Sequence, residues 1–412
     1  MKIRVFEAFA GYGSQSLALE RLKKDFPSFD YEIVGISEID KHAVQAYNAL
    51  HPGVKNYGDI SRINWDDVPD FDLFTYSSPC QDFSVAGKGA GGTEGSGTRS
   101  SLLWECRRAI VSKRPKFLLL ENVAALVSNK FRPLFNKWQA ELLSYGYSNF
   151  AKVLNSKDYG VPQNRYRIFL VSILGDVSYH FPKPFPLEKR LKDVLEDEVP
   201  EKYYLSDKML EYFRRVNEDL SHGHKFKPKS EDDVATVIKA NPAANADDNY
   251  IEYEDPTICQ RPHGFNRGGV HHVAPTITGN TFQYNNLVVQ RKTVVGDVNG
   301  ESPCITSACG AGGGTTPMVT DASLEEVRTE DFREQIRGHS ATNNRIRKLT
   351  PRELFRLMGV DDQDIDKIQA TGISDSAQKK LAGNSIVVDV LYHIFRKMFV
   401  EKDNENRQLT LF

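Results

Sequence analysis

Three short segments of the chain carry side chains that could perform chemistry, and each lies beside an apolar run. Cys80 directly follows such a run, where a cysteine at the end of a strand could act as a nucleophile. Glu121 follows another run, and Arg165 and Arg167 lead into a third. The two arginines share one face of an extended segment, because side chains alternate along it. Taken alone, Glu121 and each arginine are equally compatible with a solvated loop.

Three further sites would suit a ligand that contains adenosine. The motif FAGYG at 9–13 forms a strand-to-helix turn, where glycines let the backbone approach a ligand. The dinucleotide pattern GxGxxG is not met, because Ser16 occupies the third glycine position. An acid at the end of the next strand is placed to bind ribose hydroxyls, and another acid follows a third possible strand. The candidate cofactor contacts are Phe9, Gly11, Gly13, Glu38, Asp59 and Ile60.

Short apolar runs alternate with helical patterns through the first part of the chain. This alternation predicts βαβ units and a mostly parallel sheet, which binds ligands beyond the carboxyl ends of its strands. Thr350, with Pro351 and Glu353 after it, is typical of a helix N-terminus. We predict strands at 4–9, 31–37, 72–77, 116–120 and 167–173, and helices at 14–22, 41–50, 102–111, 132–145, 352–358 and 386–398.

The composition favours a folded chain of two or three domains, since 40% of the 412 residues are hydrophobic and 26% are charged. The net charge is −2, so any surface for nucleic acid must be local. The first residues lack the apolar core of a secretory signal, and no stretch approaches the roughly 18 apolar residues of a membrane span. Five cysteines without a CxxC pair argue against a disulfide framework or a zinc site and fit the cytoplasm.

The segment 256–296 contains no Asp or Glu. It is compatible with an all-β subdomain whose turns repeat, or with loops presented to a polyanion, and its arginines favour the second interpretation. A glycine-rich stretch at 85–101 also carries basic residues and predicts a lid that closes on a ligand. The candidate contacts to such a polyanion in these two stretches are Lys88, Arg99, Arg261, Arg267, Arg291 and Lys292.

Taken in order, these segments resemble the DNA (cytosine-5)-methyltransferase family, in its bacterial and phage restriction-modification type. The joint order and spacing of the motifs are specific, whereas any one motif alone would not be. The matches are FAGYG, the acid at Glu38, GDI at 58–60, PCQDFS at 79–84, ENV at 121–123, QNRYR at 163–167, RKLTPRE at 347–353 and GNS at 383–385.

The resemblance implies an α/β fold of the S-adenosylmethionine-dependent methyltransferase (Rossmann-like) class, with a mostly parallel sheet and a second, smaller β-rich target-recognition domain. The implied catalytic and cofactor-binding domain is 1–175, and the target-recognition domain is 176–343. The segment 344–402 returns to complete the catalytic domain, with 383–400 beside 9–13, and 403–412 is a tail.

The resemblance also assigns chemistry to the candidate residues. Cys80 would add as a thiolate to carbon-6 of a flipped cytosine, so that carbon-5 can take a methyl group from S-adenosylmethionine. Glu121, with a raised pKa, would protonate or hydrogen-bond N3, and Arg165 would contact the base carbonyl O2. Arg167 would hold Glu121 or the backbone. Asn384 and Ser385 resemble later cofactor contacts of the family.

The expected partner is duplex DNA, bound by a monomeric enzyme that protects the site from a cognate restriction endonuclease where the system includes one. One alternative is a tRNA cytosine-5 methyltransferase of related architecture, although the long acid-free region favours duplex DNA. Another is a catalytically inactive DNA-binding relative, which the joint presence of Cys80, Glu121 and Arg165 disfavours. The sequence alone does not give the recognition site.

Overall fold

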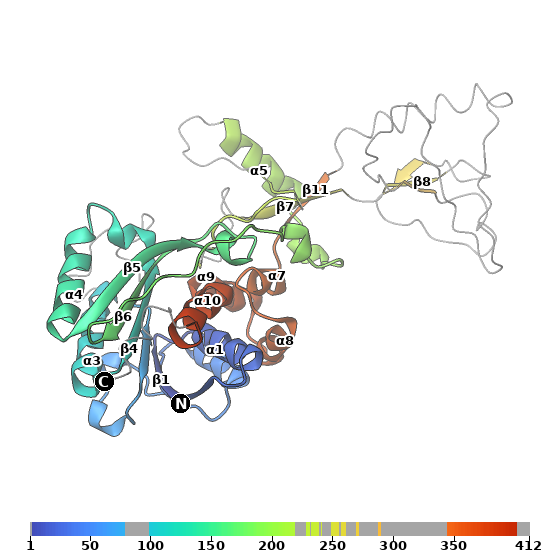
Figure 1. The fold of residues 1–412 in the computed structure, drawn as a ribbon. Helices are drawn as coiled ribbons and strands as arrows, with labels where there is room; N and C mark the ends of the chain where they lie inside the picture. Colours follow the sequence, from blue (N-terminus) through green and yellow to red (C-terminus); the bar gives the residue numbers. More distant parts are fainter. Residues whose placement is uncertain are drawn as a thin grey trace. The chain divides into compact units, whose positions relative to one another are not determined.

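The computed structural model describes residues 2–78, 99–218, 228–230, 232–238, 240, 249–254, 257–260, 269–271, 287–289 and 344–401. The chain divides into two compact units, and its course can be followed in Figure 1. The first unit combines Met1–Ile251 with Lys348–Phe412, and the second is Glu252–Arg347. The C-terminal part of the chain therefore returns to the unit that the N-terminal part begins.

A six-stranded sheet forms the centre of the first unit, in the order β2-β1-β3-β4-β6-β5. The first four strands are parallel, whereas β6 pairs antiparallel with β4 and β5 pairs antiparallel with β6. The mostly parallel sheet predicted from the sequence is thereby confirmed. The strands are β1 (Lys2–Ala8), β2 (Asp30–Ser37), β3 (Leu73–Tyr76), β4 (Phe117–Val123), β5 (Tyr147–Asn155) and β6 (Tyr166–Leu174).

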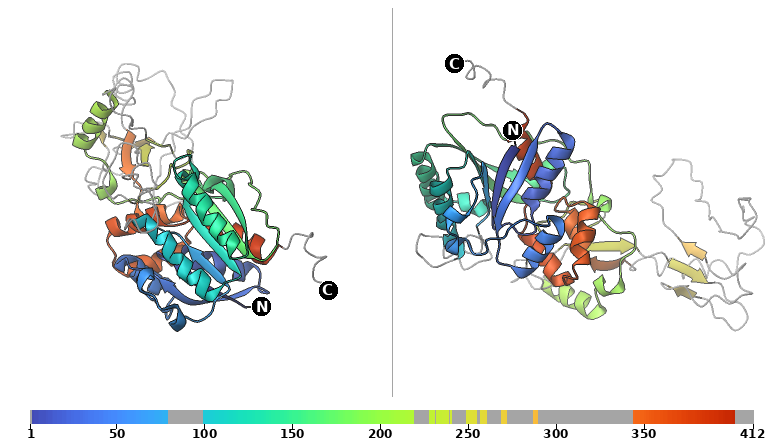
Figure 2. Two further views of the ribbon diagram at one scale, coloured as in Figure 1. Left: turned by 90° about the vertical axis from the view of Figure 1, so that its left-hand side faces the viewer. Right: turned by 90° about the horizontal axis from the view of Figure 1, so that it is seen from below.

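Helices cover both faces of this sheet (Figures 1 and 2). Alternate residues of β4 show the two cores: Phe117 and Leu119 pack on the side of α1, α2 and α10, and Leu118 and Leu120 pack on the side of α3 and α4. The helices are α1 (Ser14–Asp25), α2 (Lys41–Leu50), α3 (Cys106–Lys113), α4 (Arg132–Ser144) and α10 (Val388–Phe399).

The returning C-terminal segment forms three short helices before α10, namely α7 (Pro351–Arg356), α8 (Asp362–Ala370) and α9 (Asp375–Asn384). The Thr350 side chain accepts a hydrogen bond from the Glu353 N–H, and the Glu353 carboxylate accepts one from the Thr350 N–H. This reciprocal cap confirms the predicted start of α7. Neither α8 nor α9 was predicted from the sequence.

The first unit extends to Ile251, whereas the sequence placed the start of the recognition domain at 176. Leu191, Val194 and Ile238 lie in the same hydrophobic core as α1 and α10. Because these apolar side chains pack in the core of the first unit, the boundary between the two units comes after the proline-rich stretch, near which the sequence placed a domain boundary. The assignment of 176–343 to target recognition stays a prediction.

The remaining elements are short. In the second unit, β8 pairs antiparallel with both β9 and β10. The strand β11 pairs with β7, and the chain leaves and re-enters the first unit along these two strands. The remaining elements, in chain order, are η1 (Ile60–Arg62), η2 (Trp65–Asp67), η3 (Arg99–Glu105), η4 (Ala124–Val127), η5 (Ser156–Tyr159), η6 (Leu191–Asp193), η7 (Glu201–Tyr203), α5 (Asp207–Glu218), β7 (Tyr250–Glu254), β8 (Thr257–Gln260), β9 (Gly269–His271), β10 (Leu287–Val289) and β11 (Asn344–Lys348).

Within the described ranges, no helix is both long enough and apolar enough to cross a bilayer.

Gly13 caps the N-terminus of α1 with a φ angle of 92°, a conformation that costs any residue with a Cβ. A Cβ at this position would lie 2.9 Å from a ring carbon of Tyr47 and 2.9 Å from one of His51. Gly53 has a similar φ angle of 86°, but a Cβ there would meet nothing within 4 Å. Substitution of Gly53 would therefore incur the cost of backbone strain alone, whereas substitution of Gly13 would add the cost of crowding Tyr47 and His51.

We expect Gly13→Ala to lower the free energy of unfolding more than Gly53→Ala does. Both variants pay about 1–2 kcal/mol for the left-handed backbone. Gly13→Ala loses a further ~1–3 kcal/mol because Tyr47 and His51 must move. Urea unfolding followed by circular dichroism measures both losses, and equal losses would show that the two rings yield without cost.

Candidate active site

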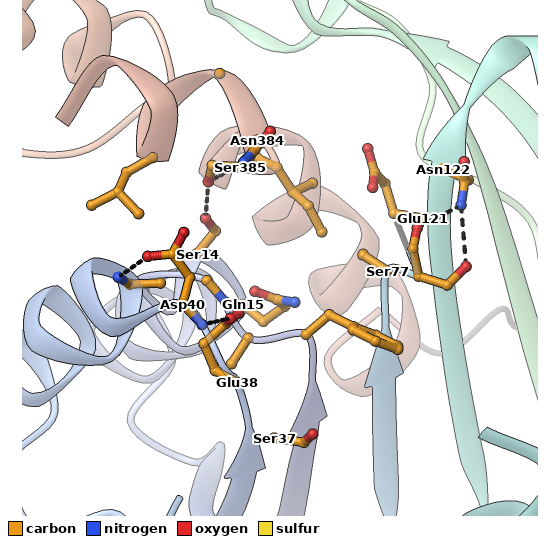
Figure 3. Close-up of a pocket in the computed structure, with 18 of the residues that line it drawn as sticks. Ser14, Gln15, Ser37, Glu38, Asp40, Ser77, Glu121, Asn122, Asn384 and Ser385 are labelled. Atoms are coloured by element: carbon orange, nitrogen blue, oxygen red, sulfur yellow. Dashed lines mark hydrogen bonds between the residues drawn. The ribbon is translucent and has the colours of Figure 1, made fainter. Parts of the chain in front are cut away.

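A cavity of about 530 Å³ lies beyond the carboxyl ends of the parallel strands (Figure 3). Its lining includes Phe9 after β1, Glu38 after β2 and Ser77 after β3, together with Glu121 near the end of β4. This is the edge at which α/β sheets bind ligands, and the volume is typical of small-molecule sites, which span roughly 300–1,000 Å³. The sequence therefore predicted the correct edge of the sheet.

The Glu38 carboxylate fastens two of the loops that form the cavity. Its Oε2 accepts a hydrogen bond of 2.9 Å from the Gly11 N–H, and its Oε1 accepts bonds of 2.8 Å from the N–H groups of Ile39 and Asp40. Gly11 has a φ angle of 59°, and Phe9, although not a glycine, also has a positive φ of 57°. One acid thus holds a sharply turned loop after β1 against the loop after β2.

Asp59 and Ile60 lie where a third loop meets the cavity. The Asp59 carboxylate caps η1 and accepts bonds of 3.0 and 2.8 Å from the N–H and hydroxyl of Ser61. These bonds, led by the backbone N–H, lower the pKa of Asp59, so its carboxyl is ionised at neutral pH. Ile60 is buried beside it and adds an apolar wall.

Glu121 lies at the other end of the cavity and is 8% exposed. Burial raises the pKa of its carboxyl above the ordinary value, although the positive charges of Arg167 and Arg165 oppose that rise. The Arg167 Nε lies 3.1 Å from Glu121 Oε1, and its Nη1 donates to the carbonyl of Tyr166 at 2.8 Å, so Arg167 contacts both Glu121 and the backbone. The direction of the pKa shift agrees with the expectation, and the catalytic role of Glu121 stays a prediction.

Arg165 is 3% exposed and reaches away from the sheet toward the C-terminal segment. Its Nη2 donates to the carbonyls of Gly383 and Ser385, at 3.1 and 2.6 Å, and its Nη1 donates to the carbonyl of Ile238 at 3.3 Å. The guanidinium that was expected to contact a base carbonyl is therefore engaged with three backbone carbonyls. Arg165 also lines the cavity, and its predicted contact with O2 stays a prediction.

Asn384 and Ser385 line the cavity opposite the sheet. The Ser385 hydroxyl shares a hydrogen bond with the hydroxyl of Ser14, the first residue of α1 (Figure 3). This contact places the GNS turn against the start of α1, immediately after the loop at 9–13. Gly13 faces Tyr47 and His51, so the structure gives it a packing role, and its contact with a cofactor stays a prediction.

Several candidates lie outside the described residues. Arg99 begins η3, but its side chain is not described. The tail at 403–412 is also outside the described range. The others outside it are Cys80, Lys88, Arg261, Arg267, Arg291 and Lys292.

Asn122 and Lys380 are among the cavity residues to which the sequence assigned no role. Asn122 donates from Nδ2 to the Ser78 carbonyl at 3.1 Å, and its place directly after Glu121 was an available signal. Lys380 donates from Nζ to Asp40 Oδ2 at 2.6 Å, and this ion pair joins α9 to the N-terminus of α2 at the cavity. The sequence offered no signal for it, because 340 positions separate the two residues.

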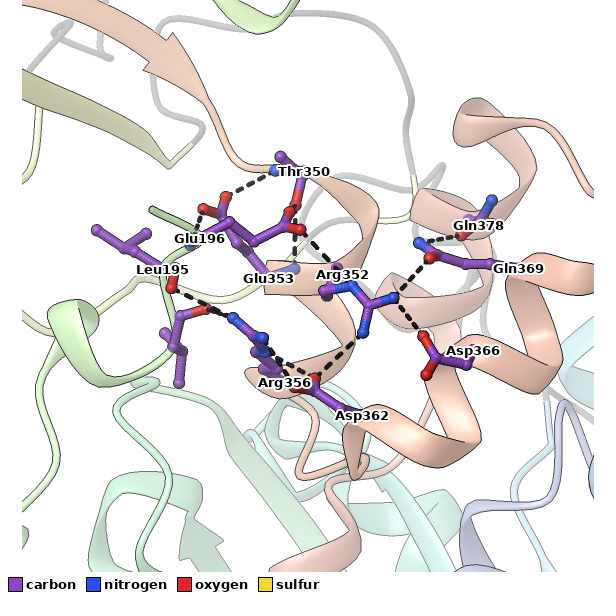
Figure 4. Close-up of polar contacts among 11 residues, drawn as sticks. Leu195, Glu196, Thr350, Arg352, Glu353, Arg356, Asp362, Asp366, Gln369 and Gln378 are labelled. Atoms are coloured by element: carbon purple, nitrogen blue, oxygen red, sulfur yellow. Dashed lines mark hydrogen bonds and ion pairs between the residues drawn. The ribbon is translucent and has the colours of Figure 1, made fainter. Parts of the chain in front are cut away.

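The RKLTPRE motif anchors α7 through a network of charged side chains (Figure 4). Arg352 lies 3.6 Å from Glu196 and 3.4 Å from Asp362, and it also donates to Asp366. Arg356 lies 2.8 Å from Asp362 and donates to the carbonyl of Val194 at 3.2 Å. The motif thus holds α7, α8 and the segment near Glu196 together within the first unit.

The sequence of the chain matches a known protein family. The family model for C-5 cytosine-specific DNA methylase matches residues 3–400, nearly the whole chain. The chain belongs to this family. Methylation of cytosine carbon-5 in DNA is the activity of the C-5 cytosine-specific DNA methylases, and this chain carries their motifs throughout its length.

Two curated relatives span almost the same length as this DNA methylase. Type II methyltransferase M2.ScrFI of Lactococcus lactis subsp. cremoris is 32% identical, and the match covers 96% of this chain and 99% of the relative. Orphan methyltransferase M.SPRI of Bacillus phage SPR is 30% identical, and that match covers 98% of this chain and 100% of the relative.

Solved structures show the same fold at low sequence identity. The crystal structure of S. pombe Dnmt2 methyltransferase superposes with a TM-score of 0.59 at 17% identity, covering 96% of this chain and 97% of that one. The Entamoeba histolytica methyltransferase EhMeth gives a TM-score of 0.59 at 15% identity, with coverage of 97% and 98%. These likenesses support the predicted α/β fold with a mostly parallel sheet, and the smaller β-rich domain stays a prediction.

We expect Arg167→Met to raise the pKa of Glu121 further, because the variant removes a cation that stabilises the ionised carboxyl. Arg167→Lys keeps a positive charge and is the matched control, in which the pKa should stay closer to that of the wild type. Infrared difference spectra recorded against pH, with Glu121→Gln to identify the band, measure the pKa. An unchanged pKa in Arg167→Met would show that the ion pair does not control this proton.

Proposed function

We propose that this enzyme transfers a methyl group from S-adenosylmethionine to carbon-5 of a flipped cytosine in duplex DNA. The main observation behind the proposal is that the two ends of one cavity carry different sets of side chains. One end has Glu38 and Asp59 beside a sharply turned loop, and the other has the buried Glu121 beside Arg167. A cofactor and a reacting base would meet between them.

The residues at the first end fit a nucleoside with a sulfonium side chain. Glu38 Oε1 accepts two backbone N–H bonds, whereas Oε2 accepts only one and keeps lone-pair capacity for a ribose hydroxyl. Phe9 and Ile60 supply apolar surface for a base, and Asn384 and Ser385 supply polar groups across the cavity. When bound, S-adenosylmethionine would supply an electrophilic methyl group.

The residues at the second end fit covalent activation of a pyrimidine. Carbon-5 of cytosine is a weak nucleophile, and addition of the Cys80 thiolate at carbon-6 would turn the ring into an enamine that can attack the methyl group. Asn122 donates to the carbonyl of Ser78, two residues before Cys80 in the sequence. After transfer, loss of the carbon-5 proton and elimination would free Cys80.

Glu121 would deliver or share a proton at N3 while charge develops on the ring. A carboxyl can do this near neutral pH because its raised pKa retains the proton. Arg167 would orient that carboxyl through the contact of 3.1 Å. The target base must leave the duplex to reach these groups, at a cost of a few kcal/mol.

The acid-free segment at 256–296, with Arg261, Arg267, Arg291 and Lys292, supports duplex DNA as the substrate. Lys88 and Arg99 would add contacts from the glycine-rich stretch. The relatives named as type II and orphan methyltransferases support protection of DNA from restriction, with or without a cognate endonuclease. We propose that the enzyme acts as a monomer in the cytoplasm, where a thiol nucleophile stays reduced.

We expect Cys80→Ser to lose methyl transfer by at least roughly a thousandfold while it still binds S-adenosylmethionine, because a serine hydroxyl is a far weaker nucleophile. Transfer of a labelled methyl group to duplex DNA measures the loss, and calorimetry measures cofactor binding. Cys106→Ala is the control, since Cys106 lies in the core beside α4 rather than in the cavity. Substantial turnover by Cys80→Ser would contradict the covalent mechanism.

The same assay with tRNA in place of DNA tests the alternative substrate. Label in duplex DNA, located at cytosines by bisulfite sequencing, supports the proposal. Label in tRNA alone would overturn it.

A further inference from the structure

One extended segment carries the inward-facing side chains that hold the cavity together. Along QNRYR, Gln163 and Arg165 are buried, whereas Asn164 and Tyr166 are exposed. Gln163 donates from Nε2 to the carbonyl of Leu357 at the end of α7, at 2.6 Å. The alternation places Gln163, Arg165 and Arg167 on one face, so each contacts a different part of the unit.

The bonds of Arg165 concentrate at the C-terminus of α9. The helix ends at Asn384, and its last carbonyls have no partners within the helix and carry the negative end of its dipole. The Arg165 Nη2 donates to the carbonyls of both Gly383 and Ser385, which flank Asn384. A charged, planar guanidinium satisfies two such carbonyls from one nitrogen and fixes the turn in space.

The turn that Arg165 holds belongs to the cofactor end of the cavity. Asn384 and Ser385 line the cavity, and the Ser385 hydroxyl shares a hydrogen bond with Ser14 at the start of α1. Arg167, two residues after Arg165, contacts Glu121 at the other end. The two arginines of the motif therefore serve opposite ends of the cavity, although only two positions separate them.

We propose that Arg165 is a positioning residue for the cofactor: it fixes the Gly383–Ser385 turn and thereby sets the affinity for S-adenosylmethionine. Three hydrogen bonds to backbone carbonyls occupy Nη1 and Nη2, and the side chain is 3% exposed. Moving the guanidinium off these carbonyls would leave them buried without a donor, a costly exchange. The inference rests on the proposed use of S-adenosylmethionine.

The test compares Arg165→Lys with Arg167→Lys, since both keep the charge and both lose the planar fork. We expect Arg165→Lys to weaken binding of S-adenosylhomocysteine by about tenfold or more, the loss of one charge-assisted hydrogen bond. Its kcat at saturating S-adenosylmethionine should approach that of the wild type. Arg167→Lys should bind S-adenosylhomocysteine within about twofold of the wild type, but it should lower kcat and shift its pH profile, because Arg167 faces Glu121.

Calorimetry gives the affinity, and methyl transfer at varied S-adenosylmethionine gives KM and kcat. If Arg165→Lys kept wild-type affinity and lost kcat, Arg165 would contact the base, and the inference would be overturned. If the wild type bound neither S-adenosylmethionine nor S-adenosylhomocysteine, the proposed function itself would fail. Arg165→Gln, a neutral side chain with two N–H donors, provides a second measurement of affinity if Arg165→Lys does not fold, with the same two outcomes.

Discussion

The strict alternation of side chains along residues 163–167 is the constraint from which the geometry of the cavity follows. An extended segment sends every second side chain to the same face, so Gln163, Arg165 and Arg167 all point inward. A shift of one residue would exchange them for Asn164 and Tyr166 and would leave buried carbonyls and Glu121 without cations. The antiparallel pairing of β6 with β4, in which Val123 lies opposite Arg167, fixes the register that prevents such a shift.

Charge in the cavity is controlled by burial and pairing together. Burial alone would make the ionised form of Glu121 unfavourable, and the neighbouring Arg167 recovers part of that cost. Asp59 shows the opposite balance, because it is more exposed and its bonds to Ser61 lower its pKa. Two carboxyls that line one cavity thus have opposite pKa shifts, which is typical of a site that must hold a proton at one end and a charge at the other.

Much of the sheet and its cavity edge could be predicted from the sequence, because buried parallel strands appear as compact apolar runs that end in polar residues. The edge strand β5 was missed, since it is half-exposed and shows no clean alternation of polar and apolar residues. The helices α8 and α9 were missed because each buries few apolar side chains, such as Ile365 and Ile368 in α8 and Leu381 in α9, so the apolar pattern along the sequence is weak. Arg165 illustrates the same limit: the family resemblance implied a base contact, but two of its three carbonyl partners lie more than 200 positions away.

The hydrogen bond between Ser14 and Ser385 joins residues that are 371 positions apart. During synthesis the first of them leaves the ribosome long before the second, and α1 then lacks α10 and the turn that precedes it. A growing or prematurely terminated chain therefore contains Cys80 and Glu121, the proposed nucleophile and acid, but lacks the turn at Ser385 that lines the cavity. On the proposed mechanism, incomplete chains would remain inert toward the genome.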